Sequence, residues 1–127
     1  MSRHARGNLN IEGNTATNFA AGIWVYDSTV NLTDTTITNN QNPDSEFGGG
    51  ILFYGNGSLT RVDFTDNSAK NGGGLFVYYE ADLEVDDCDF SGNTDDDIWV
   101  ADYSTEGGYT MEGGSGLSFS CADNVCN

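Results

Sequence analysis

The chain has 127 residues, enough for one domain, and its 20 acidic and four basic residues leave a formal charge of −16. Four cations cannot line a groove for a phosphate backbone, so we expect neither a nucleic-acid partner nor an anionic membrane surface. Glycine is abundant, with 17 residues, proline occurs once, and no apolar run reaches the roughly 20 residues of a membrane span. This composition favours short strands joined by tight turns.

Internal repeats follow a short N-terminal arm, residues 1–7. Four segments share an apolar pattern that ends in asparagine: Leu9–Asn14, Leu32–Asn40, Leu59–Asn67 and Val85–Asn93. A second apolar run follows each of them, at residues 21–26, 49–54, 73–78 and 96–101. The two patterns alternate in a constant order, so the repeat unit is about 26 residues long.

A repeat of this length without helical periodicity is typical of one coil of a solenoid built from strands. We predict an all-β fold, a right-handed parallel β-helix of about four coils over residues 8–101, with residues 102–127 as a C-terminal capping segment. Coils would lie about 4.8 Å apart, so equal positions would stack. Stacked side-chain amides bond one another along the axis, which predicts a structural ladder of Asn14, Asn40, Asn67 and Asn93.

Two further features of the repeat predict local structure. Glycine-rich stretches precede the second apolar run and indicate tight corners with positive φ. Residues 42–46 (Asn-Pro-Asp-Ser-Glu) have no counterpart in the other coils, so we expect them to form a surface loop.

The second apolar run also predicts a candidate binding surface. Side chains alternate between the two faces of a strand, so if Ile23 and Val25 point into the core, Trp24 and Tyr26 point outward. Applied to all four coils, this alternation predicts an outward strip of Trp24, Tyr26, Leu52, Tyr54, Phe76, Tyr78 and Trp99. An apolar strip of this size marks an interaction site. Three occupants remain open: the chain's own C-terminal segment (through Leu117 and Phe119, for example), another copy or partner domain, or a glycan.

Two acidic clusters, Asp86-Asp87-x-Asp89 and Asp95-Asp96-Asp97, raise the question of calcium, which prefers carboxylate oxygens. Neither cluster matches a known calcium-loop pattern, so solvated turns are the simpler interpretation. We therefore predict no cofactor, with calcium as the alternative.

The three cysteines suggest structural roles. Cys121 and Cys126 are close enough in sequence to close a small disulfide loop in the capping segment, and free thiols are the alternative. Cys88 occupies a repeat position that Thr35 and Val62 fill in other coils, so we expect a small buried side chain.

An enzymatic function is disfavoured by the residue types present. The single histidine, His4, lies in the N-terminal arm, which argues against a histidine-based triad. Twenty acidic residues supply carboxylate pairs by chance, so such a pair alone is no evidence of catalysis.

The alternation of Gly48-Gly-Gly-Ile51 with Phe64-Thr-Asp-Asn67, and of Gly72-Gly-Gly-Leu75 with Phe90-Ser-Gly-Asn93, resembles the repeats of chlamydial polymorphic outer-membrane proteins and related bacterial surface β-helix proteins. The resemblance covers about residues 8–101. It implies a parallel β-helix with an extracellular or cell-surface location, and many such relatives are adhesive.

The predicted function is therefore a non-enzymatic module for binding or adhesion through the outward strip. Structural self-assembly into an oligomer or filament is the alternative, and a fragment of a polysaccharide-active enzyme is less favoured. The ends of a solenoid expose unpaired backbone, so we expect the N-terminal end to meet another copy or an upstream part of a longer chain.

Overall fold

The computed structural model describes residues 9–43, 47–78, 81–94, 97–101 and 117–121, and every regular element in them is a β-strand. The strands are β1 (Leu9–Glu12), β2 (Ile23–Thr38), β3 (Gln41–Asn42), β4 (Ile51–Thr65), β5 (Ser68–Ala69), β6 (Leu75–Tyr78), β7 (Asp82–Ser91), β8 (Ile98–Ala101) and β9 (Leu117–Cys121). The described residues contain no helix that is long and apolar enough to cross a membrane.

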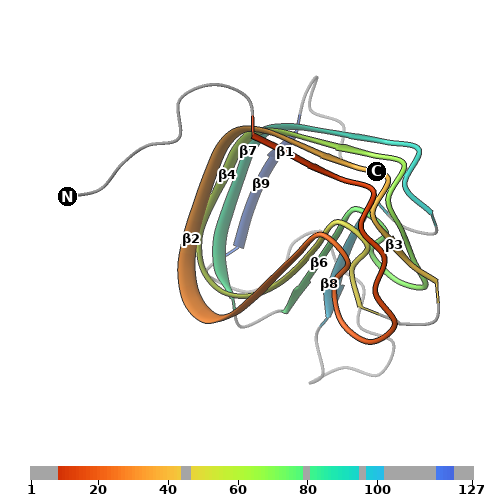
Figure 1. The fold of residues 1–127 in the computed structure, drawn as a ribbon. Coiled ribbons are helices and arrows are strands. Elements are labelled where there is room, and N and C mark those ends of the chain that lie inside the picture. Colours follow the sequence, from red (N-terminus) through yellow and green to blue (C-terminus); the bar gives the residue numbers. More distant parts are fainter. Residues whose placement is uncertain (1–8, 44–46, 79–80, 95–96, 102–116, 122–127) are drawn as a thin grey trace.

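The strands stack as a parallel β-solenoid of about three turns, which confirms the predicted fold class. Figure 1 shows successive coils overlying one another, with the strands forming the walls of the solenoid. The four asparagine positions, one in each predicted coil, are rungs of the stack, and the intervals between them make about three turns.

Two long strands bend and so contribute to two walls of the solenoid. The first part of β2 pairs with the first part of β4, and β6 and β8 continue that ladder. The second part of β2 pairs with β1 on one side and with β4 on the other, and β7 and β9 continue this second ladder. A smaller ladder of β3 and β5 forms at the asparagine corner.

The core is made by the alternate residues that the pattern predicted to point inward. Ile51, Phe53, Leu75, Val77, Ile98 and Val100 are fully buried, and Val25 is 3% exposed. On the second ladder the ring of Phe64 stacks on that of Phe90 at 4.5 Å between centroids. Equal positions in neighbouring coils therefore contact one another, as the 26-residue spacing predicted.

The asparagine ladder is present and directional. The Nδ2 of Asn14 donates to the Oδ1 of Asn40 at 2.9 Å, Asn40 donates to Asn67 at 3.0 Å, and Asn67 donates to Asn93 at 3.0 Å. Each oxygen also accepts the backbone N–H of the preceding asparagine. Asn40 and Asn67 are fully buried, so these bonds satisfy amides that water cannot reach.

The glycine corners have two physical causes. Gly48 and Gly72 have φ of +42° and +57°, as predicted for the start of each corner. Gly50 has no positive φ, but a Cβ there would lie 2.4 Å from the carbonyl oxygen of Gly74 in the next coil. Close approach of stacked backbones, rather than positive φ alone, therefore requires glycine at this corner.

The expectation of a surface loop at residues 42–46 is wrong for its first residue. Asn42 belongs to β3 and is fully buried. Its Nδ2 donates to the carbonyl oxygen of Phe47 at 2.9 Å and also to that of Phe19. Asn42 therefore links Phe47, which follows the inserted residues, to Phe19 in the neighbouring coil. Residues 44–46 lie outside the described part of the chain.

Of the predicted capping segment, residues 102–127, the structure describes one strand, β9. β9 lies within the expected capping segment, and it pairs in parallel with β7. This part of the segment therefore adds a rung to the second ladder. The predicted arm, residues 1–7, lies outside the described residues, as do residues 102–116 and 122–127 of the cap.

Candidate functional site

The predicted outward strip divides into exposed, half-buried and buried residues. Trp24 is 51% exposed and Tyr26 is 65% exposed, as expected for the first coil. Tyr54, Tyr78 and Trp99 are half-buried. The first coil is therefore the most exposed part of the strip.

The expectation that Leu52 and Phe76 face solvent is wrong. They are 1% and 2% exposed, and they form a second small apolar cluster outside the main core. Phe47 packs on Phe76 at 5.4 Å between ring centroids, and Ala20 belongs to the same cluster. The two covering residues lie in the segments that lead into β2 and β4, so these segments fold over the middle of the strip.

What remains open is a half-enclosed aromatic cleft of about 310 Å³. It is lined by Phe19, Trp24, Tyr26, Leu52, Tyr54 and Tyr78. We call this the aromatic cleft. No charged residue lines it, and Leu52 is the buried part of its lining. Its volume lies at the lower end of the range for small-molecule sites, about 300 to 1,000 Å³.

Ring contacts hold the walls of the cleft in place. Phe19 stacks on Trp24 at 4.4 Å and 17°, and Tyr26 stacks on Tyr54 at 5.7 Å and 20°. Tyr54 meets Tyr78 edge to face at 4.8 Å. These contacts restrict the rings before any ligand arrives, so less side-chain entropy would be lost on binding.

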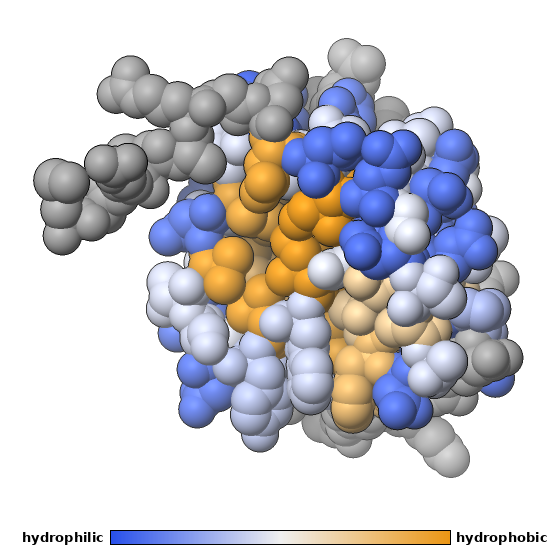
Figure 2. Space-filling model, in the orientation of Figure 1, coloured by the Kyte–Doolittle hydropathy of each residue, from blue (hydrophilic) through white to orange (hydrophobic). Residues whose placement is uncertain are grey.

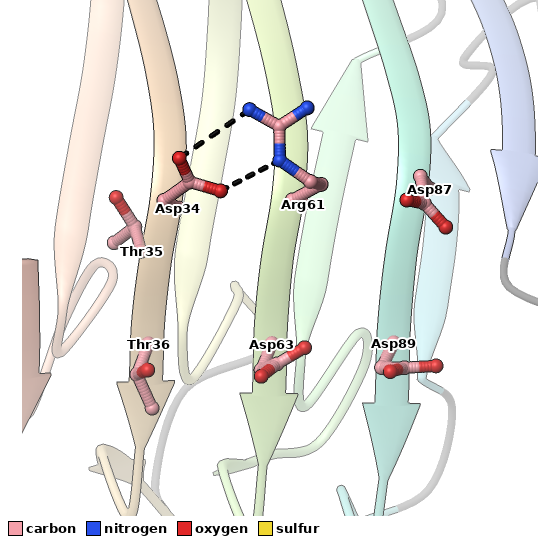
Figure 3. A pocket seen from close by; sticks show the side chains of 7 residues that line it. All are labelled: Asp34, Thr35, Thr36, Arg61, Asp63, Asp87 and Asp89. Carbon is pink, nitrogen blue, oxygen red and sulfur yellow. Dashed lines mark hydrogen bonds and ion pairs between the residues drawn. The ribbon is translucent and has the colours of Figure 1, made fainter. Parts of the chain in front are cut away.

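A second depression lies on the wall formed by β2, β4 and β7. This polar groove of about 320 Å³ is lined by Asp34, Thr35, Thr36, Arg61, Asp63, Asp87 and Asp89 (Figure 3). Arg61 forks onto Asp34, with Nε 2.6 Å from Oδ1 and Nη2 3.3 Å from Oδ2. Both side chains are about half exposed, so the pair adds little stability.

Two carboxyl groups in the polar groove have pKa values shifted in opposite directions. The hydrogen bond from Arg61 holds the pKa of Asp34 below its usual value. Burial raises the pKa of Asp63, and the negative charge of Asp89 on the next rung raises it further. Figure 3 shows Asp63 and Asp89 side by side on adjacent strands, with Arg61 directed toward Asp34.

No group of three or more acidic, histidine or cysteine side chains in the described ranges is arranged to hold a metal ion. Asp86, Asp87 and Asp89 are among those residues, whereas Asp95 and Asp96 of the second cluster lie outside them. The described residues therefore offer no cluster of carboxylates for calcium.

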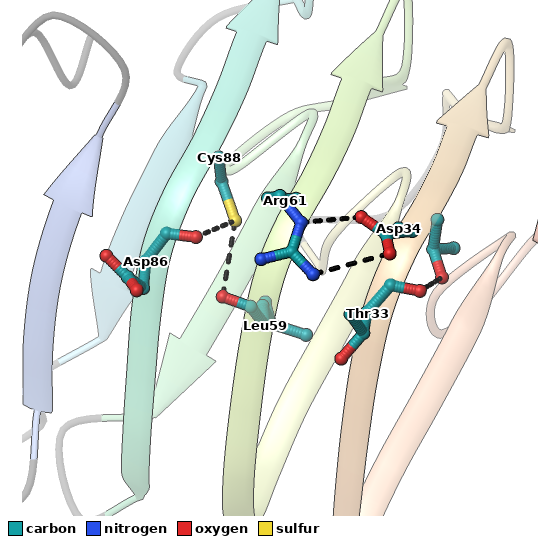
Figure 4. A network of polar contacts seen from close by, with 7 residues as sticks. Thr33, Asp34, Leu59, Arg61, Asp86 and Cys88 are labelled. Carbon is teal, nitrogen blue, oxygen red and sulfur yellow. Dashed lines mark hydrogen bonds and ion pairs between the residues drawn. The ribbon is translucent and has the colours of Figure 1, made fainter. Parts of the chain in front are cut away.

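Cys88 is the small buried residue that the repeat predicted. It is 1% exposed, and its thiol donates to the carbonyl oxygen of Leu59 at 3.3 Å (Figure 4). Burial raises the pKa of this thiol to about 11, so thiolate is scarce at neutral pH and reactivity is low. The backbone of Cys121 pairs with Cys88 across the ladder, while Cys126 and the predicted Cys121–Cys126 loop lie beyond the described residues.

Phe19 and Phe47 are the site residues that the strip pattern missed. Both lie four residues before the first residue of their strand, β2 or β4, but the same position holds Asn71 and Thr94 in the other two coils, so the repeat as a whole does not mark them. Their ring contact of 5.7 Å joins neighbouring coils beside the cleft. The available signal was an isolated aromatic residue a few positions before a strand whose outward face is also aromatic.

Comparison with known proteins identifies the fold but no individual relative. A family model described as a right-handed β-helix region matches residues 3–125. No curated protein and no solved structure matches the chain. The resemblance to chlamydial and other bacterial surface repeats therefore stays an expectation.

Proposed function

Because this chain belongs to the family of right-handed β-helix proteins, we propose that it is a non-enzymatic binding module that holds a neutral sugar ring of a glycan in the aromatic cleft. The observation that carries the proposal is the cleft, whose walls present exposed aromatic faces without a lining charge. The other depression, the polar groove, is lined by charged and hydroxyl side chains, so of the two the aromatic cleft would gain more from burying a ligand.

A sugar ring fits the chemistry of the cleft. One face of a pyranose is made of C–H groups that pack on aromatic rings, while its rim carries hydroxyl groups. Trp24 and Tyr26 offer exposed ring faces for the first, and tyrosine hydroxyls offer donors and acceptors for the second. A chain of formal charge −16 repels acidic sugars, so we expect neutral glycans to be preferred.

The proposed location is the cell surface or the extracellular space. The support for it is the likeness of the Gly-Gly-Gly and Phe-x-x-Asn repeats to surface β-helix proteins. A binding module in that location would be adhesive when its glycan belongs to another cell or to a matrix.

The test is a glycan array followed by titration of the best neutral glycan. Replacing Trp24 by Ala should weaken binding about tenfold or more, because about 1.4 kcal/mol of ring contact is lost. Tyr26→Phe keeps the ring, so its loss of affinity should measure what the tyrosine hydroxyl contributes to glycan binding. Leu9→Ala is the matched control, because Leu9 is 41% exposed and does not line the cleft. Binding that is absent, or equal in Trp24→Ala and the parent chain, would contradict the proposal.

A polysaccharide-active enzyme is the second candidate, and one observation favours it. Asp63 and Asp89 are ladder neighbours in the polar groove, and the raised pKa of Asp63 favours its protonated form, as an acid catalyst requires. The test is release of reducing ends from polysaccharides by the parent chain and by Asp63→Asn. If the chain only binds glycans, neither the parent chain nor Asp63→Asn releases reducing ends. Release by the parent chain that is lost in Asp63→Asn would establish the enzyme.

A further inference from the structure

Asn42 is a buried asparagine that the repeat itself does not require. Its backbone lies in β3 opposite Ala69 of β5, and its side chain is fully buried. The equivalent residue of the first coil is Ala16, because Thr15 bridges Gln41 in the same register. The coil therefore needs only a small side chain at this position, and the amide of Asn42 is an addition to the repeat.

The amide of Asn42 donates to two segments that carry aromatic rings. Its Nδ2 lies 2.9 Å from the carbonyl oxygen of Phe47 and 3.4 Å from that of Asn18, and it also donates to the carbonyl oxygen of Phe19. The Oδ1 of Asn42 has no hydrogen-bond partner among the described residues. Each described hydrogen bond of this side chain therefore holds the backbone of Asn18, Phe19 or Phe47.

Phe19 depends on this amide because its segment has few other bonds. The segment between β1 and β2 lies on the face shown in Figure 2, where apolar side chains gather at the centre. Its described backbone bonds all run to the following coil, from residues 13–16 and from Gly22. Between them, residues 17–21 form no backbone–backbone hydrogen bond with another described residue. Asn42 therefore supplies the described polar anchor of Phe19.

The position of Phe19 decides the shape of the aromatic cleft. Its ring stacks on Trp24 at 4.4 Å between centroids and lies 5.7 Å from the ring of Phe47. Phe19 is 41% exposed, so packing covers only part of the ring. Without the bond from Asn42 the segment would be free to move, and a ligand would have to order the ring on binding.

We propose that Asn42 is a positioning residue of the aromatic cleft, which holds Phe19 against Trp24 before a ligand binds. Asn42 is fully buried and does not line the cleft, so it acts through the backbone of Phe19. The role in binding rests on the proposed glycan function. The stacking of Phe19 on Trp24 is measurable without a glycan, so the two proposals can be tested separately.

Asn42→Ala tests the proposal in the full chain. Alanine is the residue that other coils have at this position, so the variant should fold, which circular dichroism checks. The parent chain should give strong nuclear Overhauser effects between the rings of Phe19 and Trp24, and Asn42→Ala should lose most of their intensity. Affinity for the best neutral glycan of the array should fall about fivefold, because binding must then order the segment. Asn42→Ser, with a shorter side chain, repeats the test if Asn42→Ala fails to fold.

A double-mutant cycle separates positioning from a general structural role. Phe19→Leu removes the ring, so adding Asn42→Ala to it should weaken glycan binding little further, whereas a general structural role gives additive losses. Asn67→Ala is the matched control, because Asn67 is equally buried and none of its described hydrogen bonds reaches a residue that lines the cleft. The control should keep the ring contacts and the glycan affinity of the parent chain.

The outcomes distinguish the two proposals. If the parent chain binds no neutral glycan, the proposed function fails, and the ring contacts still decide whether Asn42 positions Phe19. If the parent chain binds a glycan and Asn42→Ala keeps the ring contacts or the affinity, the positioning role is wrong and glycan binding stands. Additive losses in the cycle, or an equal loss of affinity in Asn67→Ala, would also overturn the positioning role, because they assign the effect to a general loss of structure.

Discussion

At the residue scale, the polar groove shows how neighbours on adjacent rungs set the charge of one carboxyl group. Asp63 lies opposite Asp89, and burial together with that negative charge raises the pKa of Asp63. The folded chain therefore holds the Asp63 proton more tightly than the unfolded chain does. The resulting stabilisation is present below the unfolded pKa and is lost as pH rises through the folded pKa.

The substitution Asp63→Asn should therefore stabilise the fold at neutral pH. Removing one of two like charges on facing positions is worth about 0.5 kcal/mol, and the gain should vanish in acid, where Asp63 is already protonated. Urea unfolding at pH 7 and at pH 3.5 measures both effects. Asp82→Asn is the control, because the ladder neighbour of Asp82 is the uncharged Asn56. A gain that persists at pH 3.5 would show that charge is not its cause.

Residue-scale prediction from the sequence succeeded where a strand pattern alone decides burial. Alternation placed Val25 and Phe53 in the core correctly. It failed for Leu52 and Phe76, because their cover comes from Phe47 and Ala20 in irregular segments. Alternation assigns a side of the strand, but it carries no information about what packs against the outer side.

At the scale of elements, the asparagine ladder couples neighbouring coils at one corner. Asn67 is fully buried and donates to the Oδ1 of Asn93 at 3.0 Å and to the carbonyl oxygen of Ile37 at 2.9 Å. Its own Oδ1 accepts two bonds from Asn40. Asn14 makes comparable donor bonds to Asn40, but from an exposed end where water can replace them.

Position along the stack should therefore decide the cost of losing an asparagine. We expect Asn67→Ala to lower the free energy of unfolding by about 3 kcal/mol, because the buried Asn40 on one side and the half-buried Asn93 on the other both lose bonds. Asn14→Ala should cost less than about 1 kcal/mol. Urea unfolding of the two variants provides the comparison. Equal costs would show that the ladder bonds contribute independently of burial.

The ladder and the corners were predictable because each coil repeats the same residues at the same spacing. The recurrence of asparagine at 14, 40, 67 and 93 gave both the register and the chemistry of the corner. The aromatic cleft was predictable only in part. Trp24, Tyr26, Tyr54 and Tyr78 follow the repeat, whereas Phe19 lies before the repeated run, at a position that is aromatic in only two of the four coils.

At the scale of the whole molecule, the two ends and the charge distinguish this solenoid. Leu9 and Ile23 on the first described rungs keep exposed apolar surface, whereas Ile98 and Val100 on the last rung of the first ladder are fully buried. The stacking that aligns like apolar residues also aligns like charges, as Asp63 and Asp89 show. In a chain of formal charge −16, coil stacking must therefore overcome repulsion along the axis.

Salt should consequently stabilise the fold. Rungs lie about 4.8 Å apart, while the screening length shortens from about 30 Å at 0.01 M salt to about 3 Å at 1 M. We expect the thermal midpoint to rise by several degrees over that range of sodium chloride. Measurements at a protein concentration where sedimentation shows only monomer keep association out of the result. Calcium chloride at matched ionic strength separates the two causes: an equal rise indicates screening, whereas a larger rise indicates a calcium site. A midpoint that is unchanged or falls with sodium chloride would mean that the acidic residues are far enough apart to leave coil stacking unaffected.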